Sequence, residues 1–407
     1  MTKKYGLMSS GMLLAVVLAY LAFWPTPADP VAWQPPKDAG YVGDHAVNHK
    51  LAELQQWALG SEQEGPEFIA VSDGVLYTGL SNGDILKINA DGQQQELVVN
   101  TGGRPLGLDV DTQGRLLVAD GLRGLLRVTG RGHDAKIESL LTTVQQPVAN
   151  DLVRYADAVK IGQDGTIWLT DASRRFDPKD WGGTFEASVL DILEQQCTGR
   201  VIAQNPITLA ARVAMDGLCF PNGLEFSGDG KTMYVSETGS YRILAVNMVK
   251  LASLGADQGA KAVPTLTQAM KLGAVTVFAD NLPGFPDNLT RSSSGRIWVG
   301  LTKPRSPVVD ALAPYPFLRQ ITLRLPRFLW PVPPAYGHVI AYDEKGTVVD
   351  DLQDPTGAYP ETTAATEAYG KLYIQSLHSH TIGWIPYVGP QVPRAEVEDY
   401  LDGILAH

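Results

Sequence analysis

One hairpin-like phrase recurs along this chain from residue 66 onward. Each copy has a short alternating run, a turn such as Asp-Gly or Ser-Gly, and a second apolar run that ends in small or polar residues, which is typical of a β-hairpin. The copies read "GPEFIAVSDGVLYTGL", "RPLGLDVDTQGRLLVAD", "YADAVKIGQDGTIWLTD", "FPNGLEFSGDGKTMYVSE", "FPDNLTRSSSGRIWVGL" and, more weakly, "TTAATEAYGKLYIQSL". Such a series of hairpins predicts an all-β fold.

Further strand-like runs lie between the hairpins, among them "DILKINA", "GLLRVTG" and "RILAVNM". They bring each unit to about four strands, the content of one propeller blade. A single blade cannot bury both of its faces, whereas a ring of blades buries them and removes most exposed edges. The sequence therefore predicts a six-bladed β-propeller over residues 49–407. We expect the segment "HKLAELQQWAL" to add a strand to the last blade and close the ring.

The N-terminal segment has a different character. After Lys3 and Lys4 comes the uncharged run "YGLMSSGMLLAVVLAYLAFW", which as a helix would span roughly 30 Å of hydrocarbon. The pattern predicts a transmembrane signal anchor over residues 1–26, with the propeller on the exported (periplasmic or extracytoplasmic) side of the membrane. A cleaved signal peptide is the alternative. Residues 27–48 are rich in proline and are expected to form an extended linker that holds the propeller off the membrane.

Charge and cysteine content limit the partners and the compartment. The formal net charge of −11 argues against nucleic acid as a partner, because a phosphate backbone is bound through a basic face. Cys197 and Cys219 flank two β-rich runs hinged at Asn205 and Pro206. An antiparallel hairpin would bring the two cysteines together, and either a disulfide or two buried thiols fits the pattern.

Polar residues stand at the entrance of the first strand in four of the predicted blades. In a propeller these entrances meet at one end of the central channel. The equivalent positions are Glu67, Asp157, Asn222 and Asp287, with Asn288 beside the last. This all-oxygen set suits a hard cation, and Ca²⁺ tolerates irregular coordination better than Mg²⁺. We therefore expect one Ca²⁺ on the propeller axis; the alternative is that these side chains only cap strand ends.

Four phrases of the sequence resemble those of a known protein family. The phrases "EGPEFIAV", "FPNGLEFSGDGKTMYVSETGSYRI", "ADNLPGFPDNLTRSSSGRIWVGL" and "YIQSLHS" resemble the strictosidine synthase-like family, including the adipocyte plasma membrane-associated proteins, within the gluconolactonase and paraoxonase superfamily. The resemblance runs from about Asp29 to the C-terminus. It implies a six-bladed calcium propeller, often membrane-anchored, with esterase or lactonase chemistry in many members. It also implies that Glu67, Asp157, Asn222 and Asp287 are calcium ligands, joined by Asn288 in paraoxonase-like members.

The chain departs from the family pattern at several positions. Thr363 stands where strictosidine synthase has its essential glutamate, with Glu361 and Glu367 nearby but out of register, so strictosidine synthase activity is not expected. The other departures are Leu106 for a paraoxonase histidine, Tyr155 for a gluconolactonase arginine, and Phe68 and Ala158 for residues that help hold a second calcium in paraoxonases. One metal ion is therefore expected.

The expected function is hydrolysis of an apolar ester or lactone, as a membrane-anchored arylesterase or lactonase. Calcium would act as a Lewis acid, and Asp287 would orient or deprotonate the attacking water. We expect His378, which we take to be the only histidine near the end of a blade strand, to move a proton; a structural role for it is the alternative. Two other functions remain open: a non-catalytic, calcium-stabilised binding or scaffold propeller, and another reaction on the same metal, such as a condensation.

Two insertions are expected to shape the site. The stretch "WGGTFEASVLDILEQQ" predicts an amphipathic helix between blades. Residues 306–334 are apolar and carry Arg319, Arg324 and Arg327. This segment is expected to rest on the membrane, to form a lid over the metal, or both. A pair formed by Glu237 and Arg242 is expected within one blade.

Overall fold

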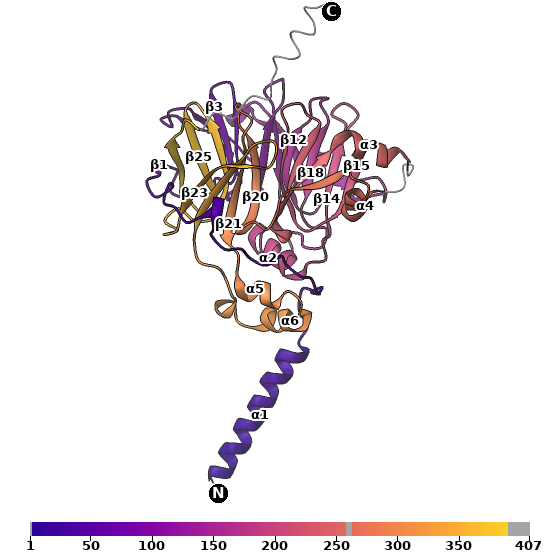
Figure 1. The fold of residues 1–407 in the computed structure, drawn as a ribbon, viewed down its shortest axis with the longest axis vertical. Coiled ribbons are helices and arrows are strands. Elements are labelled where there is room, and N and C mark those ends of the chain that lie inside the picture. Colours follow the sequence, from indigo (N-terminus) through magenta and orange to yellow (C-terminus); the bar gives the residue numbers. More distant parts are fainter. Residues whose placement is uncertain (1, 258–262, 390–407) are drawn as a thin grey trace, which may run out of the picture.

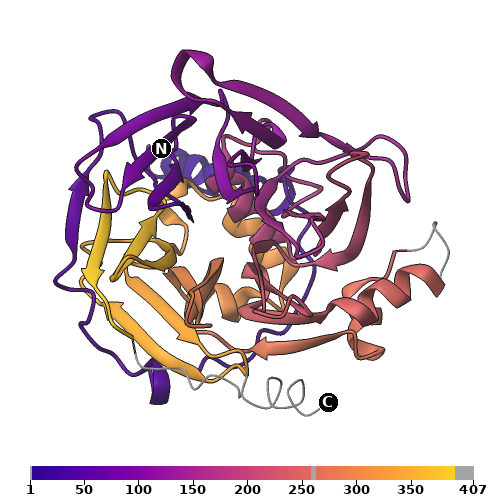
Figure 2. The same ribbon diagram turned by 90° about the horizontal axis from the view of Figure 1, so that it is seen from above.

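The computed structural model describes residues 2–257 and 263–389, with side chains over residues 12–255 and 263–389. Residue 1 of the predicted anchor, and residues 258–262 and 390–407 of the predicted propeller range, lie outside this description. Six four-stranded antiparallel sheets surround a central channel (Figure 2). The six-bladed all-β propeller predicted from the hairpin repeats is therefore confirmed.

The strands of the first five blades follow one another in sequence, from the channel outward. Their bounds are β2 (Ile69–Ser72), β3 (Val75–Gly79), β4 (Asp84–Asn89) and β5 (Gln95–Asn100); β6 (Pro105–Val110), β7 (Leu116–Asp120), β8 (Gly124–Thr129) and β9 (Lys136–Leu141); β12 (Ala156–Ile161), β13 (Ile167–Asp171), β14 (Gly199–Gln204) and β15 (Ala211–Leu218); β16 (Pro221–Phe226), β17 (Thr232–Glu237), β18 (Arg242–Asn247) and β19 (Val275–Ala279); β20 (Gly284–Arg291), β21 (Ile297–Pro304), β22 (Gly337–Tyr342) and β23 (Val348–Asp354). A short pair, β10 (Thr143–Val144) and β11 (Asp151–Leu152), lies outside the blades.

The sixth blade joins the two ends of the propeller. Its inner strands are β24 (Thr362–Ala368), β25 (Lys371–Ser376) and β26 (Thr381–Pro386), and its outer strand is β1 (Gln55–Ala58). β1 pairs antiparallel with β26, with Trp57 opposite Ile382. The predicted closing strand is thus confirmed.

The innermost strands pack closely around the channel, and glycine is needed where they touch. A Cβ atom on Gly223 in β16 would lie 2.4 Å from the backbone nitrogen of Leu289 in β20. The glycine in "FPNGL" is therefore required by the approach of two neighbouring blades. Away from the channel, apolar side chains fill the spaces between blades, for example where Val201 of blade 3 and Leu224 and Val235 of blade 4 share one buried cluster.

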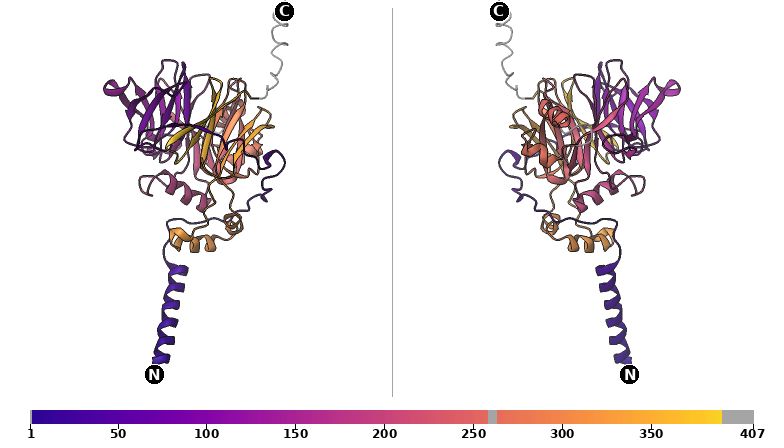
Figure 3. Two further views of the ribbon diagram at one scale, coloured as in Figure 1. Left: turned by 90° about the vertical axis from the view of Figure 1, so that its left-hand side faces the viewer. Right: turned by 90° about the vertical axis from the view of Figure 1, so that its right-hand side faces the viewer.

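Helical insertions cover one end of the channel. α2 (Thr184–Glu194) connects β13 to β14 inside blade 3, and α5 (Pro307–Leu312) and α6 (Pro316–Arg324) connect β21 to β22 inside blade 5. Connections between the second and third strands of a blade lie at the end where the first strand begins, so these insertions form one cap over the strand entrances (Figures 1 and 3). The helix predicted in residues 181–196 is confirmed, but it lies within a blade instead of between two. α3 (Met248–Asp257) and α4 (Leu266–Lys271) lie between β18 and β19.

The linker after the N-terminal helix packs against the cap. It has no helix before η1 (Gly43–His45), as expected of an extended segment. Its backbone nevertheless makes specific contacts, since Val31 N donates to Glu194 O at 2.8 Å and Trp33 N donates to Ala313 O at 3.3 Å. The extended linker is therefore held against α2 and the residue after α5.

The N-terminal helix, α1 (Thr2–Phe23), extends from the cap and away from the propeller (Figure 1). Its C-terminal end is capped by Arg324, which donates from Nε to Trp24 O at 2.5 Å and from Nη1 to Leu21 O at 2.9 Å. These bonds satisfy carbonyl groups that the helix itself leaves without partners. Over the described residues, no helix combines the length and the hydropathy needed to cross a membrane.

Candidate functional site

The five predicted metal ligands all lie at the entrances of inner strands. Glu67 lies two residues before β2, and the other four lie in β12, β16 and β20. Each is between 0% and 5% exposed. In β12, β16 and β20 the pairing register shifts across these positions, between Ala156 and Val159, between Pro221 and Leu224, and between Pro286 and Leu289. Such bulges release a side chain from the regular alternation of the strand and redirect it.

The structure brings these residues close enough to interact. Asn288 Nδ2 in β20 donates to the backbone oxygen of Glu67 at 3.5 Å. Burial raises the pKa of Asp157 well above its ordinary range, and the negative charge of Glu67 raises it further. The pKa of Asp287 is raised in the same way by burial and then by Glu67 and Asp157. Three carboxylates therefore repel one another in a site shielded from water.

The oxygens of this group are ready to bind a cation. Among the described residues, Asp157, Asn222, Asp287 and Asn288 each have a buried Oδ1 atom without a hydrogen-bond partner. Leaving a polar atom buried and unpaired costs roughly 1–3 kcal/mol, so four such atoms in one group need a common explanation. All four are acceptors, and a hard cation satisfies them together. The residues present therefore fit a calcium ion.

Arg104 is a member of this group that the sequence did not predict. It precedes β6, and it donates from Nη2 to Glu67 Oε2 at 2.8 Å and from Nη1 to Gly65 O at 3.2 Å. Its only sequence signal is its place immediately before an inner strand. Arg104 holds the Glu67 side chain and supplies positive charge beside three carboxylates.

The residues that depart from the family pattern have structural partners of their own. Thr363 Oγ1 donates to the backbone oxygen of Glu67 at 2.6 Å. The Tyr155 hydroxyl donates to Thr184 O at 2.9 Å, and burial and then Asp157 raise its pKa well above the ordinary value. Leu106 is buried in the apolar cluster that includes α2. These side chains hold the site and the cap together.

The five predicted ligands, Glu67, Asp157, Asn222, Asp287 and Asn288, are called the axial group below. A cavity of about 150 Å³ lies between this axial group and the cap. Asp287 lines it from the channel side, while α2 and the 306–334 insertion line it from above with apolar side chains that include Phe185, Ile192, Val309 and Trp330. A molecule in this cavity would contact the Asp287 carboxylate at one end and mostly apolar side chains elsewhere, together with Lys303, Arg327 and Glu361. The cavity therefore favours a mostly apolar ligand that carries a polar group.

A second polar cluster borders the cavity. Glu361 lines it and pairs with Lys303 at 2.6 Å and with His378 through Nδ1. The hydrogen bond that His378 Nδ1 donates to Glu361 raises the pKa of His378. Burial opposes ionisation of Glu361, but hydrogen bonds from His378 and Lys303 lower its pKa overall. Sequence reasoning placed Glu361 out of register, yet it faces the cavity, whereas Glu367 pairs with Arg296 at 2.6 Å.

Burial raises the pKa of Glu67, and the charges of Arg104 and then of His378 act against that rise. The His378 ring also contacts the ring of Phe185 edge-on, with centroids 5.7 Å apart. The expectation that His378 is the only histidine near the end of a blade strand is wrong, because His338 is the second residue of β22.

The two cysteines form a disulfide, which settles the alternative left open by the sequence. Cys197 follows α2 and Cys219 shortly precedes β16, so the bond joins the cap to the strand that carries Asn222. The predicted pair of Glu237 and Arg242 is also present, at 2.6 Å.

The three arginines of the 306–334 segment do not form one basic surface. Arg319 is buried and donates to Leu193 O at 2.7 Å and to Ala313 O at 3.0 Å. Arg324 is also buried, where it caps α1. Arg327 alone of the three is exposed enough to meet a membrane surface, and it pairs with Glu186 at 2.8 Å.

Comparison with known proteins gives consistent results. Residues 43–88 match the family described as strictosidine synthase-like, N-terminal, and residues 157–247 match the strictosidine synthase family. The adipocyte plasma membrane-associated protein of Danio rerio is 28% identical over 388 residues, which cover 90% of this chain and 86% of that protein. Its counterpart in Salmo salar is 29% identical over 361 residues, which cover 83% and 79%. The resemblance seen in the sequence is thereby confirmed.

A solved structure shares the fold. The gluconolactonase from Xanthomonas campestris superposes with a TM-score of 0.55 at 19% identity, covering 89% of this chain and 98% of that one. At this identity the likeness supports the propeller architecture alone.

Proposed function

Because this chain is similar over most of its length to the strictosidine synthase-like proteins and has a gluconolactonase-like propeller fold, we propose that it is a calcium-dependent hydrolase of apolar esters or lactones. One observation carries the proposal: the unpaired buried oxygens at the strand entrances lie beneath an apolar cavity, and Asp287 belongs to both. A metal site at one end of a mostly apolar cavity suits attack on a carbonyl group better than it suits a purely structural ion.

Glu67, Asp157, Asn222, Asp287 and Asn288 would hold the calcium ion. Bound there, the ion supplies Lewis-acid polarisation of a carbonyl oxygen. Asp287 is the one carboxylate of the set that lines the cavity, so it is positioned to orient a water molecule or to take its proton. The apolar walls would hold the acyl or aryl part of the substrate and exclude other water.

The polar cluster at the rim of the cavity can manage protons. Glu361 faces the cavity and shares a hydrogen bond with His378, and Lys303 neutralises its other oxygen. A carboxylate and imidazole pair of this kind can carry a proton between the cavity and the outside, since 47% of the His378 side chain is exposed. We assign His378 to this proton transfer and Glu361 to positioning it.

A non-catalytic role has a specific observation in its favour. Leu106 and Tyr155 replace a histidine and an arginine that the resemblance associates with activity, and both pack into the cap. On this second candidate, calcium would stabilise a binding or scaffold propeller, and the cavity would hold a ligand without changing it.

Measurement of ester or lactone hydrolysis distinguishes the hydrolase from the non-catalytic scaffold. Purified protein should hydrolyse aryl esters or lactones in calcium and lose that activity in chelator, and elemental analysis should find one calcium per chain. Calcium binding without turnover of any ester or lactone would favour the scaffold. Protein without bound calcium, and with the same melting temperature in chelator, would overturn both candidates.

We also propose that the protein is held on a membrane by α1 and by the apolar surface of the cap. The described part of α1 exposes large apolar side chains around the helix, among them Met12, Val16 and Phe23. The adjacent cap adds exposed apolar residues, namely Phe317, Leu318, Phe328, Leu329 and Val332. A surface of this kind next to an apolar helix is suited to the interface of a bilayer. The name of the Danio rerio relative, a plasma membrane-associated protein, supports this placement.

A further inference from the structure

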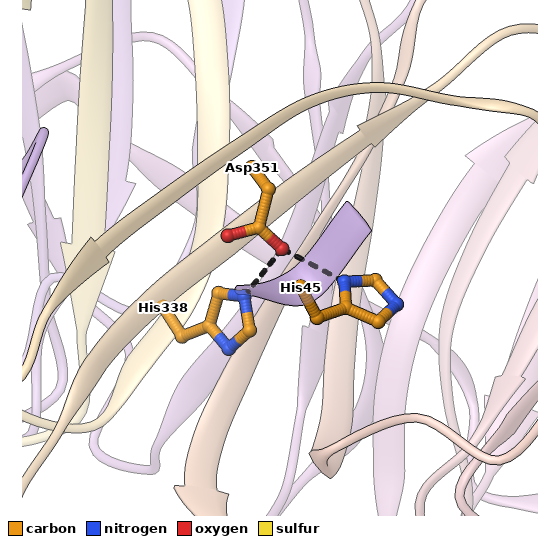
Figure 4. Close-up of side chains that lie close together, drawn as sticks. All are labelled: His45, His338 and Asp351. Atoms are coloured by element: carbon orange, nitrogen blue, oxygen red, sulfur yellow. Dashed lines mark hydrogen bonds and ion pairs between the residues drawn. The ribbon is translucent and has the colours of Figure 1, made fainter. Parts of the chain in front are cut away.

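A second cluster of metal-binding side chains lies outside the channel, where the linker crosses blade 5 (Figure 4). It consists of His45 in η1, His338 in β22 and Asp351 in β23. His45 Nδ1 lies 2.8 Å and His338 Nε2 lies 2.9 Å from the same atom, Asp351 Oδ2. Three potential ligand atoms from three separate segments therefore share one small space.

We propose that His45, His338 and Asp351 bind a divalent transition-metal ion, with Zn²⁺ as the best fit, and that this ion fastens the linker to blade 5. Two imidazoles and one carboxylate are ligands that Zn²⁺ accepts, whereas calcium prefers an all-oxygen set. Tetrahedral ligands at roughly 2.0–2.1 Å from zinc lie about 3.4 Å apart. These two contacts would each widen by about half an ångström to admit the ion, and the ligand atoms of all three residues already lie within 4.8 Å of one another.

The carboxylate is already held as a metal ligand would be. Its other oxygen, Asp351 Oδ1, accepts hydrogen bonds from Asn48 Nδ2, at 3.2 Å, and from Gln353 Nε2. Such outer contacts orient a ligand carboxylate and leave the opposite oxygen free to face the ion. The linker is also fixed here by its backbone, because Leu51 N donates to Gln353 O at 3.0 Å.

The surroundings favour a cation, and the site can be reached. Besides burial, the negative charges of Asp38 and Asp351 raise the pKa of Tyr41. Besides burial, the negative charges of Asp351 and Asp44 raise the pKa of Tyr342. His338 is 1% exposed, whereas 22% of the His45 side chain is exposed, which gives an ion a path from solvent.

Binding of the ion at this site requires no net gain or loss of protons by the two histidines. Each ring now donates an N–H to Asp351 Oδ2, and each would move that hydrogen to its other nitrogen when the first nitrogen binds the ion. For His45 the other nitrogen belongs to a partly exposed ring. For His338 the other nitrogen, Nδ1, is buried and has no hydrogen-bond partner among the described residues, so the change of tautomer breaks no hydrogen bond there but leaves an unpaired N–H, a cost that the bonds to the ion must exceed.

The test is a zinc titration of the full-length chain in detergent micelles, without a histidine tag and with calcium in excess to fill the axial site. Calorimetry should find one Zn²⁺ per chain. His45→Gln retains a hydrogen-bond donor for Asp351 but removes the imidazole ligand, and it should weaken zinc binding by at least about tenfold. His49 is an exposed histidine in the same segment. The His49→Gln chain should bind zinc as the unmodified chain does.

Cobalt gives an independent readout. Co²⁺ should show the visible absorption of a low-coordinate site in the unmodified chain and in His49→Gln, and not in His45→Gln. The proposal is overturned if the unmodified chain binds no zinc, or if His45→Gln binds it equally well. A lower melting temperature of His45→Gln with no zinc bound by either protein would identify a hydrogen-bonded latch without metal, and would also overturn it.

Discussion

Arg104 donates a hydrogen bond to Glu67 inside the axial group, from Nη2 to Oε2 at 2.8 Å. One oxygen of Glu67 is therefore occupied by a guanidinium, whereas Asp157 and Asp287 each keep a buried oxygen without a partner in the described structure. The three carboxylates are consequently not equivalent, although their positions in the sequence repeats are.

This inequality predicts an order of effects on calcium affinity. Asp157→Asn should lower the affinity more than Glu67→Gln, because Arg104 already neutralises part of the Glu67 charge. A site filled at about a hundred times its Kd contributes roughly 2.7 kcal/mol to stability, so each variant should also narrow the gap between melting temperatures in calcium and in chelator. Asp109→Asn is the control, because Asp109 lies in inner strand β6 but bonds Ile161 N, away from the group. Equal losses in Asp157→Asn and Glu67→Gln would contradict the order.

Asp287→Asn should separate metal binding from turnover. Excess calcium should refill the site, because the amide keeps an oxygen ligand, yet hydrolysis should remain about 10²–10⁴-fold lower if the carboxylate takes the proton of the attacking water. The measurement is ester or lactone hydrolysis against calcium concentration. Glu367→Gln, which changes a carboxylate paired with Arg296, serves as the control. Recovery of full activity in calcium would remove Asp287 from proton transfer.

The Glu361 and His378 pair predicts a defined pH window. The pKa of His378 is raised from its ordinary value of 6.5, so its contribution to stability is complete below that pH and is lost as the pH rises through the raised value. The pKa of Glu361 is lowered from 4.5, so its contribution is lost only as the pH falls through the lowered value. The pair should therefore stabilise fully between these ordinary values. His378→Gln should flatten the dependence of melting temperature on pH above that window, and an unchanged profile would show that the pair adds nothing.

The membrane proposal predicts that α1 and the cap each contribute to lipid binding and can be tested separately. A chain lacking residues 1–24 should fold and still bind lipid vesicles weakly through the cap. Phe317→Ser and Phe328→Ser should each weaken that binding by about tenfold, since burying one such side chain is worth ~1.5 kcal/mol or more. Ile207→Ser is the matched control, because Ile207 is 88% exposed but lies in the β14–β15 turn, at the opposite end of the propeller. Equal loss in the control would indicate non-specific adsorption.

Removal of the disulfide should loosen the cap. Cys197→Ser with Cys219→Ser should lower the free energy of unfolding by about 3 kcal/mol, because a cross-link restricts the unfolded chain. Thermal unfolding in oxidising buffer measures this loss. Calcium affinity should fall as well, because Cys219 shortly precedes the strand that carries Asn222. An equal loss of stability after reduction of the unmodified chain would confirm that the bond is responsible.

The architecture could be predicted because each hairpin repeat identifies one blade from residues that lie close together in the sequence. The turn residues and alternating runs fixed six units, and the extra run at 49–59 indicated how the ring closes. The entrances of the inner strands could be aligned on the same turns, which brought five oxygen-bearing residues to one proposed site. These inferences need only spacing within a repeat.

Other parts of the site depend on geometry that spacing does not contain. Glu361 reaches the cavity from a position that the alignment left out of register, and it has a φ of 54°, a conformation that few non-glycine residues adopt. Arg104 was not among the aligned entrance residues, yet it contacts Glu67. Arg319 looked like a surface cation, but it is buried because the linker and the cap present carbonyl groups to it. The linker and blade 5 meet across some 300 residues of sequence, so the cluster of His45, His338 and Asp351 has no local signature.

The pairing of β1 with β26 also orders events during synthesis. The outer strand of the sixth blade is made before the first blade, whereas its other three strands are made last. Until β26 has emerged from the ribosome the sixth blade cannot be completed, and we expect the two end blades of the other five to expose apolar faces. The emerging chain should therefore be most prone to aggregate just before its last blade is complete, and a stop codon in β24 or β25 should harm folding as severely as the loss of β1.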